Sequence, residues 1–298
     1  MSRSRVKFSL GTAQFGLAYG RHLSSPVPEE EVARILSASF ARGVDMLDTA
    51  AAYGNAEEVI GRQMPTGARC AITTKISRTQ SNAIGQSEVD ALKESVRRSL
   101  RNLRVDILDS VLLHHSDDLL KPGGAALFGA LAALKSGGRI GRIGISVYEP
   151  GELDRLLDRF PIEVVQLPFN ILDQRFLRSG HLELLSRKGI EVQVRSVFLQ
   201  GVLLSNIPDL PPRFAAAKEL LLEIGAAASA LGLSRQAFLL RCVTATPYVS
   251  SIVVGVDGLA HLNENLSAFE EAVVSDDRPG LSRYAIDDPD LVDPRRWS

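Results

Sequence analysis

Cysteine and net charge are both scarce in this sequence. Among 298 residues there are only two cysteines, Cys70 and Cys242, far apart and without a CxxC pair or a His/Cys cluster. This argues against a disulfide-built scaffold and against the usual zinc motifs, so we expect no metal site. The formal net charge of −1 provides no positive field to attract nucleic acid or an anionic membrane.

Long hydrophobic runs are also missing. No apolar stretch approaches the roughly 20 residues that cross a bilayer, and the first eight residues, MSRSRVKF, lack the apolar segment of a signal peptide. We therefore expect a cytoplasmic protein with reduced thiols, Cys70 buried in a strand, and neither a membrane nor a nucleic-acid partner. The sequence leaves the oligomeric state open.

What the sequence does contain is a regular alternation of short apolar runs and helical patterns. We expect strands over residues 6–12, 44–50, 70–76, 107–114, 140–147, 164–169, 190–197 and 249–256. Helices are expected over 28–43, 55–64, 88–103, 125–136, 151–160, 182–188, 234–245 and 259–272, with an extra helical stretch over 214–231. Near-continuous apolar strands that alternate with helices predict a parallel sheet covered on both sides.

Two α/β architectures fit this alternation, an open doubly wound sheet and a closed barrel. The open sheet normally carries a G-x-G-x-x-G loop after its first strand, and the turn over residues 11–16, GTAQFG, lacks that spacing. We therefore predict a single (β/α)8 TIM barrel domain over residues 1–298. The polar, proline-containing extension after Ser275 is expected to wrap over one end of the barrel, with Trp297 as an anchor.

Four polar residues stand at or just past the ends of three successive predicted strands: Asp48, Tyr53, Lys75 and His114. In a closed barrel these ends converge on the reactive face. We expect the Lys75 ammonium to lower the pKa of Tyr53 and Asp48 to hold Lys75 in place. Such a group can protonate an alkoxide as a carbonyl is reduced, and the hydride must then come from a nicotinamide cofactor.

Each of these residues, taken alone, also has an ordinary structural explanation, such as a strand-end cap or a surface charge. It is their order and placement together that favours catalysis. The neighbouring histidines compete for one role, because strand alternation points only one of them into the barrel mouth. We assign that role to His114 and expect His115 to line the entrance or to pack outward. We expect His22 and His181 to lie at the surface.

The motifs around these residues resemble the aldo-keto reductase family. The resemblance preserves order and spacing from about residue 8 to residue 270, and the matching segments are 10–12 (LGT), 47–54 (LDTAAAYG), 74–75 (TK), 112–114 (LLH), 144–146 (GIS), 166–170 (QLPFN), 253–255 (VVG) and 262–265 (LNEN). The resemblance implies that Tyr53 is the general acid, that Lys75 and Asp48 tune it, and that His114 orients the carbonyl.

The resemblance also implies a cofactor, NADP(H), with NAD(H) as the other possibility. Ser146 and Gln166 would hold the nicotinamide carboxamide, the loop over 195–201 would cross the pyrophosphate, and the turn over 255–258 with the start of the last helix would hold the adenosine. The full expected set of contacts is Thr12, Asp48, Ser146, Gln166, Arg195, Ser196, Phe198, Gly201, Gly255, Val256, Asp257, His261, Glu264 and Asn265.

Three departures from the family pattern qualify this expectation. Val147 stands where many members have asparagine, so one bond to the carboxamide is missing or replaced. Arg195 stands where many members stack an aromatic ring under the nicotinamide, and we hypothesise that its charge biases binding toward the reduced cofactor. Asp257 and His261 stand where NADP-specific members place Lys or Arg. This difference favours the use of both cofactors, or of NAD(H).

The sequence therefore predicts an oxidoreductase that reduces an aldehyde or ketone, with small-molecule carbonyl compounds as substrates. The segments 11–20 and 195–203 resemble members linked to sugars, so a sugar is a candidate substrate. Two alternatives stay open: an aldose 1-dehydrogenase working oxidatively, and a cofactor-binding regulatory subunit like the β subunits of potassium channels. Candidate contacts in the pocket are Gln14, Phe15, Tyr19, Arg175 and Trp297.

Overall fold

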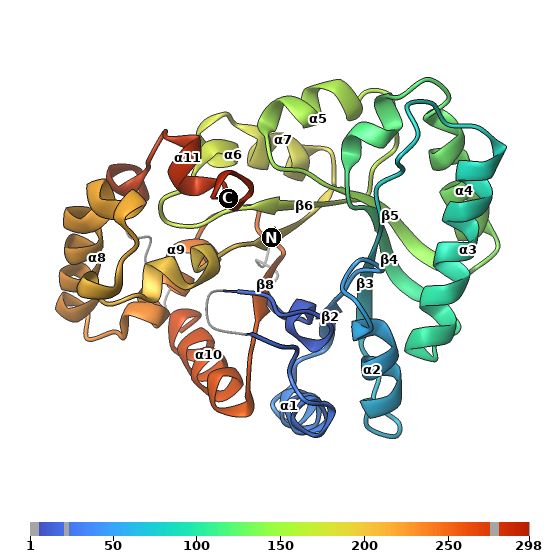
Figure 1. Cartoon of the computed structure of the whole chain (residues 1–298). Helices are drawn as coiled ribbons and strands as arrows, with labels where there is room; N and C mark the ends of the chain where they lie inside the picture. The colour runs from blue at the N-terminus through green and yellow to red at the C-terminus, as the bar shows by residue number, and fades with distance from the viewer. Residues whose placement is uncertain (1–5, 21–23, 275–279, 298) are drawn as a thin grey trace.

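Eight parallel strands close into a barrel in their sequence order, β1 to β8, which confirms the predicted (β/α)8 architecture. The computed structural model describes residues 6–20, 24–274 and 280–297 (Figure 1). The strands are β1 Lys7–Gly11, β2 Met46–Asp48, β3 Ala71–Ile76, β4 Leu108–Leu113, β5 Ile140–Ser146, β6 Val164–Pro168, β7 Glu191–Arg195 and β8 Ser251–Gly255. Each predicted strand is present and is somewhat shorter than its apolar run.

Helices surround the barrel and connect successive strands (Figure 1). They are α1 Glu29–Ala41, α2 Ala56–Gln63, α3 Gln86–Leu103, α4 Ala125–Ser136, α5 Pro150–Leu156, α6 Arg175–Arg178, α7 His181–Arg187, α8 Lys218–Ala230, α9 Arg235–Thr244, α10 Leu259–Ala272 and α11 Pro289–Val292. The 3-10 helices are Ala13–Phe15, Ser116–Leu120, Leu199–Leu204, Ile207–Asp209, Pro212–Ala217, Leu281–Tyr284 and Pro294–Arg296. The helix predicted over 259–272 has those bounds in the structure.

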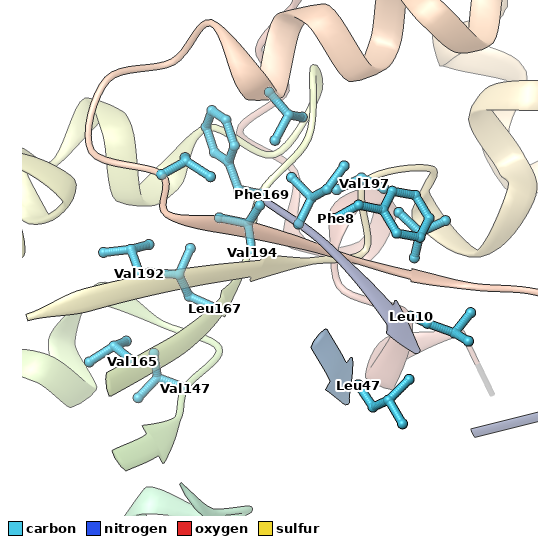
Figure 2. Close-up of a cluster of buried hydrophobic side chains, with 14 of the residues drawn as sticks. Phe8, Leu10, Leu47, Val147, Val165, Leu167, Phe169, Val192, Val194 and Val197 are labelled. Atoms are coloured by element: carbon cyan, nitrogen blue, oxygen red, sulfur yellow. The ribbon is translucent and has the colours of Figure 1, made fainter. Parts of the chain in front are cut away.

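The apolar core lies between the strands and the helices. Figure 2 shows part of it, with Leu10 and Leu47 on one side of the view and Val165, Leu167 and Val192 on the other. Along β6, Val165 and Leu167 belong to this core, and Gln166 alternates with them and therefore faces the barrel interior. The alternation explains why this strand is apolar except for one buried amide.

The barrel interior is polar toward its centre. Gln166 Nε2 on β6 donates to Asp48 Oδ1 on β2 at 2.7 Å, and Gln193 Nε2 on β7 donates to Thr73 Oγ1 on β3 at 3.3 Å. The two amides are joined by a bond of 3.3 Å from Gln166 Nε2 to Gln193 Oε1. Because the bonds to Asp48 and Thr73 connect strands that are not neighbours, they fix the positions of these strands across the barrel.

The C-terminal extension packs over the carboxyl ends of the strands, as predicted. Ile286 N donates to Leu172 O, in the loop after β6, at 3.0 Å. The ring of Trp297 packs edge-on against Phe214, with centroids 5.1 Å apart. The first part of this extension, residues 275–279, lies outside the described residues. Over the described ranges, no helix is long and apolar enough to span a bilayer.

Two expectations about single residues need correction. Cys70 precedes β3 and is only partly buried, whereas Cys242 is fully buried; burial raises the pKa of these thiols to about 11 and about 12. His181, expected at the surface, is 9% exposed and forms bonds to Ser179 Oγ at 2.8 Å and Asp154 Oδ1 at 3.0 Å. His181 opens α7, where its ring fills the space beside Phe176. His22 lies outside the described residues.

Candidate active site

The four residues singled out from strand ends meet at one end of the barrel. Asp48 ends β2, Lys75 lies near the end of β3, His114 follows β4, and Tyr53 lies in the turn before α2. Lys75 Nζ is 2.6 Å from Asp48 Oδ2 and 5.1 Å from the centroid of the Tyr53 ring. The rings of Tyr53 and His114 meet edge to face, with centroids 6.0 Å apart. The parallel barrel thus brings together residues from four segments.

Lys75 and Asp48 form an ion pair that is closed off from solvent. Their side chains are 1% and 5% exposed, and Lys75 Nζ also donates to Thr49 O at 3.0 Å. Burial lowers the pKa of Lys75, and the charge of Asp48 opposes that shift. Asp48 Oδ1 accepts the bond from Gln166 described above, so both oxygens of this carboxylate have partners.

The expected acidification of Tyr53 by Lys75 is not found. Burial raises the pKa of Tyr53 above its ordinary value, the Asp48 carboxylate raises it further, and Arg195 is the cation that opposes the shift. The physical reason is that Asp48 lies 2.6 Å from the Lys75 ammonium and offsets its charge. Tyr53 is therefore a fully protonated phenol at neutral pH.

His114 is a neutral imidazole in this environment. Burial, followed by the charges of Lys75, His115 and Arg195, lowers the pKa of His114 to about 3. His114 is partly buried and lines the cavity with Tyr53, whereas His115 is exposed. This matches the predicted division of roles between the two histidines.

The turn that carries Tyr53 is held by two glycines that face each other. A Cβ at Gly16 would overlap the carbonyl oxygen of Tyr53, and a Cβ at Gly54 would overlap that of Gly16. Gly54 also has φ +56°, a conformation that favours glycine. The segment after β1 therefore packs directly on the backbone of the Tyr53 turn and fixes its position.

A cavity of about 370 Å³ opens beside these residues at the carboxyl ends of the strands. Most of the residues predicted to contact a cofactor or substrate line it: Thr12, Asp48, Tyr53, His114, Gln166, Arg195, Ser196, Phe198, Gly201, Gly255, Asp257 and His261, with Gln14 and Tyr19. The size is typical of small-molecule sites, and the lining combines apolar surface with a few polar groups.

Several of the predicted residues do not line the cavity: Lys75, Ser146, Val256, Glu264, Asn265, Phe15, Arg175 and Trp297. Lys75 lies behind Asp48, and Ser146 and Val256 are buried next to lining residues. Asn265 donates to His261 O at 2.9 Å and accepts from Gln236 Nε2 at 2.5 Å, so its amide braces α10. Arg175 is paired with Asp173 at 2.8 Å and Glu149 at 2.7 Å.

Sequence reasoning missed Tyr148, which lines the cavity just after β5. The Arg195 guanidinium lies 4.0 Å from the centroid of its ring, and the Arg295 guanidinium lies 3.7 Å from the same centroid. Arg195 therefore stacks on a tyrosine of the protein, and Arg195 Nη2 donates to Val147 O at 3.2 Å. The position of Tyr148 at a strand end was the signal that could have identified it.

The loop after β7 adopts an unusual backbone. Ser196, Leu199 and Gln200 have φ values of 61°, 48° and 51°, and Gly201 has φ 87°. Asn170 Nδ2 donates to Ser196 O at 3.0 Å and holds the start of this loop. Non-glycine residues with positive φ cost energy and tend to gather at ligand sites. This loop is the one that the family resemblance places across a cofactor pyrophosphate.

The cavity contains polar atoms that suit a nicotinamide carboxamide. Gln166 Oε1 and Gln14 Oε1 are buried and have no hydrogen-bond partner. Both side chains line the cavity, and a buried acceptor without a donor is costly unless a ligand supplies one. A Cβ at Gly255 would lie 2.7 Å from Gln14 Nε2, so this glycine allows the amide to pack closely. These two acceptors therefore fit a ligand whose amide N–H groups can donate to them.

The opposite end of the cavity is acidic. Asp257 Oδ1 lies 2.7 Å from His261 Nδ1, and Glu31 Oε1 on α1 accepts the backbone N–H of Leu259 at 2.6 Å. Arg34 pairs with Glu31. Among the residues that line the cavity in the described part of the chain, Arg195 is the only arginine or lysine. The N-terminus of α10 is thus already bound by a carboxylate.

A larger groove of about 1220 Å³ lies at the other end of the barrel, along the amino ends of β5 to β8. Its charged residues include Arg142 and Glu191, which pair with each other, and Arg142 also pairs with Asp109. The smaller cavity is the one beside Tyr53, His114 and the Lys75–Asp48 pair. It also contains the unpartnered oxygens of Gln14 and Gln166 and the positive-φ loop after β7. We therefore place the candidate active site there.

Comparison with known proteins gives a consistent result. The model of the aldo/keto reductase family matches residues 7–280. An aldo-keto reductase of Mycobacterium sp. (strain KMS) is 34% identical over 189 residues, which cover 60% of this chain and 63% of the relative. A 6-dehydroglucose reductase of Agrobacterium fabrum is 25% identical over 187 residues, which cover 57% of this chain and 62% of the relative. The matched part thus spans less than two thirds of these relatives.

Solved structures share the fold at lower identity. An aldo-keto reductase from Bacillus halodurans in its holo form superposes with a TM-score of 0.69 at 21% identity and covers 93% of this chain and 94% of its own. A glycerol dehydrogenase from Gluconobacter oxydans superposes with a TM-score of 0.69 at 20% identity and covers 92% of this chain and 91% of its own. At these identities the likeness concerns the barrel alone.

Proposed function

Because the chain belongs to the aldo/keto reductase family, we propose that it is a nicotinamide-dependent oxidoreductase, folded as one barrel domain, that reduces an aldehyde or ketone to the alcohol. The observation that carries the proposal is the cluster of Tyr53, His114 and the buried Lys75–Asp48 pair at the mouth of the barrel. Catalytic groups at the carboxyl ends of strands are typical of such barrels.

We assign the proton to Tyr53. A reduced nicotinamide, when bound, would supply hydride to the carbonyl carbon, and the carbonyl oxygen would then need a proton. The raised pKa keeps Tyr53 protonated before reaction. An alkoxide is a much stronger base than a phenolate, so transfer of the proton from Tyr53 to the product oxygen is favourable.

We propose that His114 orients the carbonyl group and that the Lys75–Asp48 ion pair keeps a positive charge near Tyr53. As a neutral imidazole, His114 can donate a hydrogen bond to the carbonyl oxygen without competing for the proton. Lys75 places a positive charge 5.1 Å from the Tyr53 ring, and Asp48 keeps that lysine charged in spite of its burial. After proton transfer, Arg195 is the cation that stabilises the Tyr53 phenolate.

We further propose that NAD(H) is preferred over NADP(H), although the family resemblance alone favours NADP(H). Tyr53 and Asp257 both line the cavity, and we place the nicotinamide beside Tyr53 and the adenosine beside Asp257. Asp257 and Glu31 of α1, which accepts the Leu259 N–H at the start of α10, would repel a 2′-phosphate and can accept bonds from ribose hydroxyls.

A sugar carbonyl compound is the substrate class that we favour within this activity, because the Agrobacterium relative is named a 6-dehydroglucose reductase. The proposal is tested by following the absorbance of the reduced nicotinamide during incubation with a panel of aldehydes and aldoses and with each cofactor. Steady turnover in the reductive direction is expected. Tight cofactor binding with a single turnover only would favour a regulatory subunit, and faster oxidation of aldoses would favour an aldose dehydrogenase.

A further inference from the structure

We propose that the carbonyl substrate carries an anionic group, a carboxylate or a phosphate, and that Arg195 binds it. The inference rests on the proposed function and adds a substrate class to it. Arg195 ends β7 and lines the cavity. Within the described ranges it has no carboxylate partner, and its one hydrogen bond goes to Val147 O. Most donors of its guanidinium are therefore left for a ligand.

The carboxylate that acts on Tyr53 is already compensated, because Asp48 is paired with Lys75 at 2.6 Å. The other carboxylate of the cavity, Asp257, contacts His261 at 2.7 Å. Arg195 is therefore the one cavity cation without a counter-ion among the residues that the structure describes. A partly buried charge is costly unless it is paired, so a ligand with a complementary charge gains from entering this site.

Arg195 lies at the reacting end of the cavity. Burial is the main cause of the lowered pKa of His114, and the charge of Arg195 contributes to the same shift. Its charge also opposes the burial-driven rise in the pKa of Tyr53 and of Tyr19. An anionic group bound to Arg195 would therefore lie close to the carbonyl that Tyr53 and His114 receive.

The stack around Tyr148 holds Arg195 in a fixed orientation. The Tyr148 ring lies between the guanidinium groups of Arg195, at 4.0 Å, and Arg295, at 3.7 Å. Arg295 is anchored in turn by Asp293 and lies 3.7 Å from Glu149. Because a planar guanidinium that is already oriented loses little freedom on binding, this arrangement favours recognition of a carboxylate or phosphate.

Three acidic side chains around the entrance have cationic partners, which offset much of their repulsion of an anion. The pairs are Glu149 with Arg175 at 2.7 Å, Asp117 with Arg155 at 3.2 Å and Asp118 with Lys121 at 2.7 Å. Arg78 is exposed and acts electrostatically on the entrance residue His115, as does Arg295. Arg295 is already paired with Asp293, so Arg78 is the entrance cation for which the described residues provide no carboxylate partner, and its charge would steer anions toward the cavity.

Two other roles for Arg195 make different predictions. If Arg195 pairs with the diphosphate of the cofactor, its loss weakens cofactor binding whatever the substrate. If Arg195 serves mainly to acidify Tyr53, its loss slows charged and neutral substrates alike. Binding of a substrate anion is the only one of the three that makes the effect depend on substrate charge.

The experiment compares matched carbonyl compounds: succinic semialdehyde with butanal, and glyceraldehyde 3-phosphate with glyceraldehyde. For wild type we expect kcat/KM to be higher for the charged member of each pair by about tenfold or more. In Arg195→Gln we expect that ratio to fall by roughly 10- to 100-fold, and in Arg195→Lys to fall less, because the charge is retained. The carboxylate and phosphate pairs show which anion is preferred.

Arg296→Ala is the matched control, because Arg296 lies beside Arg295 and pairs with the exposed Asp290 at 3.0 Å. We expect its ratio of kcat/KM for the charged and the neutral substrate to stay at the wild-type value.

Dissociation constants for NADH and NADPH, measured by nicotinamide fluorescence, provide a second readout. An equal loss for both members of a pair, or a loss explained by weaker cofactor binding, would overturn the inference. If wild type reduces no carbonyl compound at all, the proposed function itself fails.

Discussion

Glu31 Oε1 accepts the backbone N–H of Leu259 at 2.6 Å, so a carboxylate from α1 binds the N-terminus of α10. A free helix N-terminus is a natural place for a phosphate group. Here its first donor is taken, and Asp257 adds a second negative charge nearby. The contact joins the first and last helices of the barrel and shapes the end of the cavity that we assign to the adenosine.

This contact predicts that removal of the charge at Glu31 improves binding of NADPH relative to NADH. In Glu31→Gln the amide can still accept the Leu259 N–H, and one repulsive charge is lost. Since two charges a few ångströms apart in a solvated site interact by about 1 kcal/mol, we expect the ratio of the two dissociation constants to change by roughly three- to tenfold. Fluorescence titration with each reduced cofactor measures it.

Glu30→Gln is the control for that variant, because Glu30 is exposed on the same helix and changes the net charge by the same amount. We expect its ratio of dissociation constants to match wild type. If Glu31→Gln behaves in the same way as Glu30→Gln, the carboxylate does not select the cofactor.

Tyr53→Phe should abolish most of the reductase activity and leave cofactor binding intact. The substitution removes only the hydroxyl, and loss of a positioned general acid typically lowers kcat by about 10²- to 10⁴-fold. Steady-state rates with an aldehyde, together with the dissociation constant of the reduced cofactor, test this. A variant that keeps a tenth or more of wild-type kcat would remove Tyr53 from the proton-transfer step.

Lys75→Met should destabilise the fold, because it leaves Asp48 as an unpaired charge in the barrel interior. Breaking a buried pair on one side costs about 3–5 kcal/mol, and removal of both charges restores much of that loss. We therefore expect Asp48→Asn combined with Lys75→Met to be more stable than Lys75→Met alone. Urea unfolding of the single and double variants compares their free energies.

Equal unfolding free energies for the single and the double variant would show that Asp48 tolerates the loss of its partner. In that case the bond from Gln166 to Asp48 would carry most of the compensation.

The rate of carbonyl reduction should change little across neutral pH. His114 has a pKa of about 3 and is neutral well below its usual titration range. Tyr53 has a raised pKa, so it stays protonated and able to donate until the pH passes above the ordinary value for a phenol. We expect kcat/KM to be flat between about pH 5 and pH 9. An inflection near about pH 6.5 that disappears in His114→Asn would contradict the neutral imidazole.

Gly16→Ala should lower activity by displacing the Tyr53 turn. Its Cβ would overlap the backbone carbonyl of Tyr53, so the turn must shift. Because a misplacement of about 1 Å can cost on the order of 10²-fold in rate, kcat should fall by that order. Gly129→Ala is the control, since Gly129 lies within α4 with open space around its Cα, and there alanine should stabilise the helix by about 0.5–1 kcal/mol.

Circular dichroism and kcat of the two alanine variants would be compared. A Gly16→Ala protein with wild-type kcat would show that the turn can shift without displacing the Tyr53 hydroxyl. The packing of Gly16 would then not fix the position of Tyr53.

The part of the site that the sequence predicted well consists of residues at strand ends. The rule that parallel strands in a barrel share one reactive end placed Asp48, Lys75 and His114 together before any contact was known. Periodicity likewise located the helix over 259–272. These features depend on local patterns, which a single sequence displays directly.

Other features depend on contacts between distant segments and could not be read in this way. The partners of Tyr148 come from β7 and from the C-terminal extension, and Glu31 reaches Leu259 across more than two hundred positions. The raised pKa of Tyr53 was missed for a related reason. The expected effect of Lys75 took no account of the burial of the phenol or of the way Asp48 offsets the lysine charge at close range.

The guanidinium of Arg295 on Tyr148 has a practical consequence for recombinant work. A bulky label attached next to Arg295 would lie close to a side chain of the cavity wall. Val6 lies at the amino end of β1, on the side of the barrel away from the carboxyl ends of the strands. Labels near Val6 are therefore the sound choice for assays and ligand soaks.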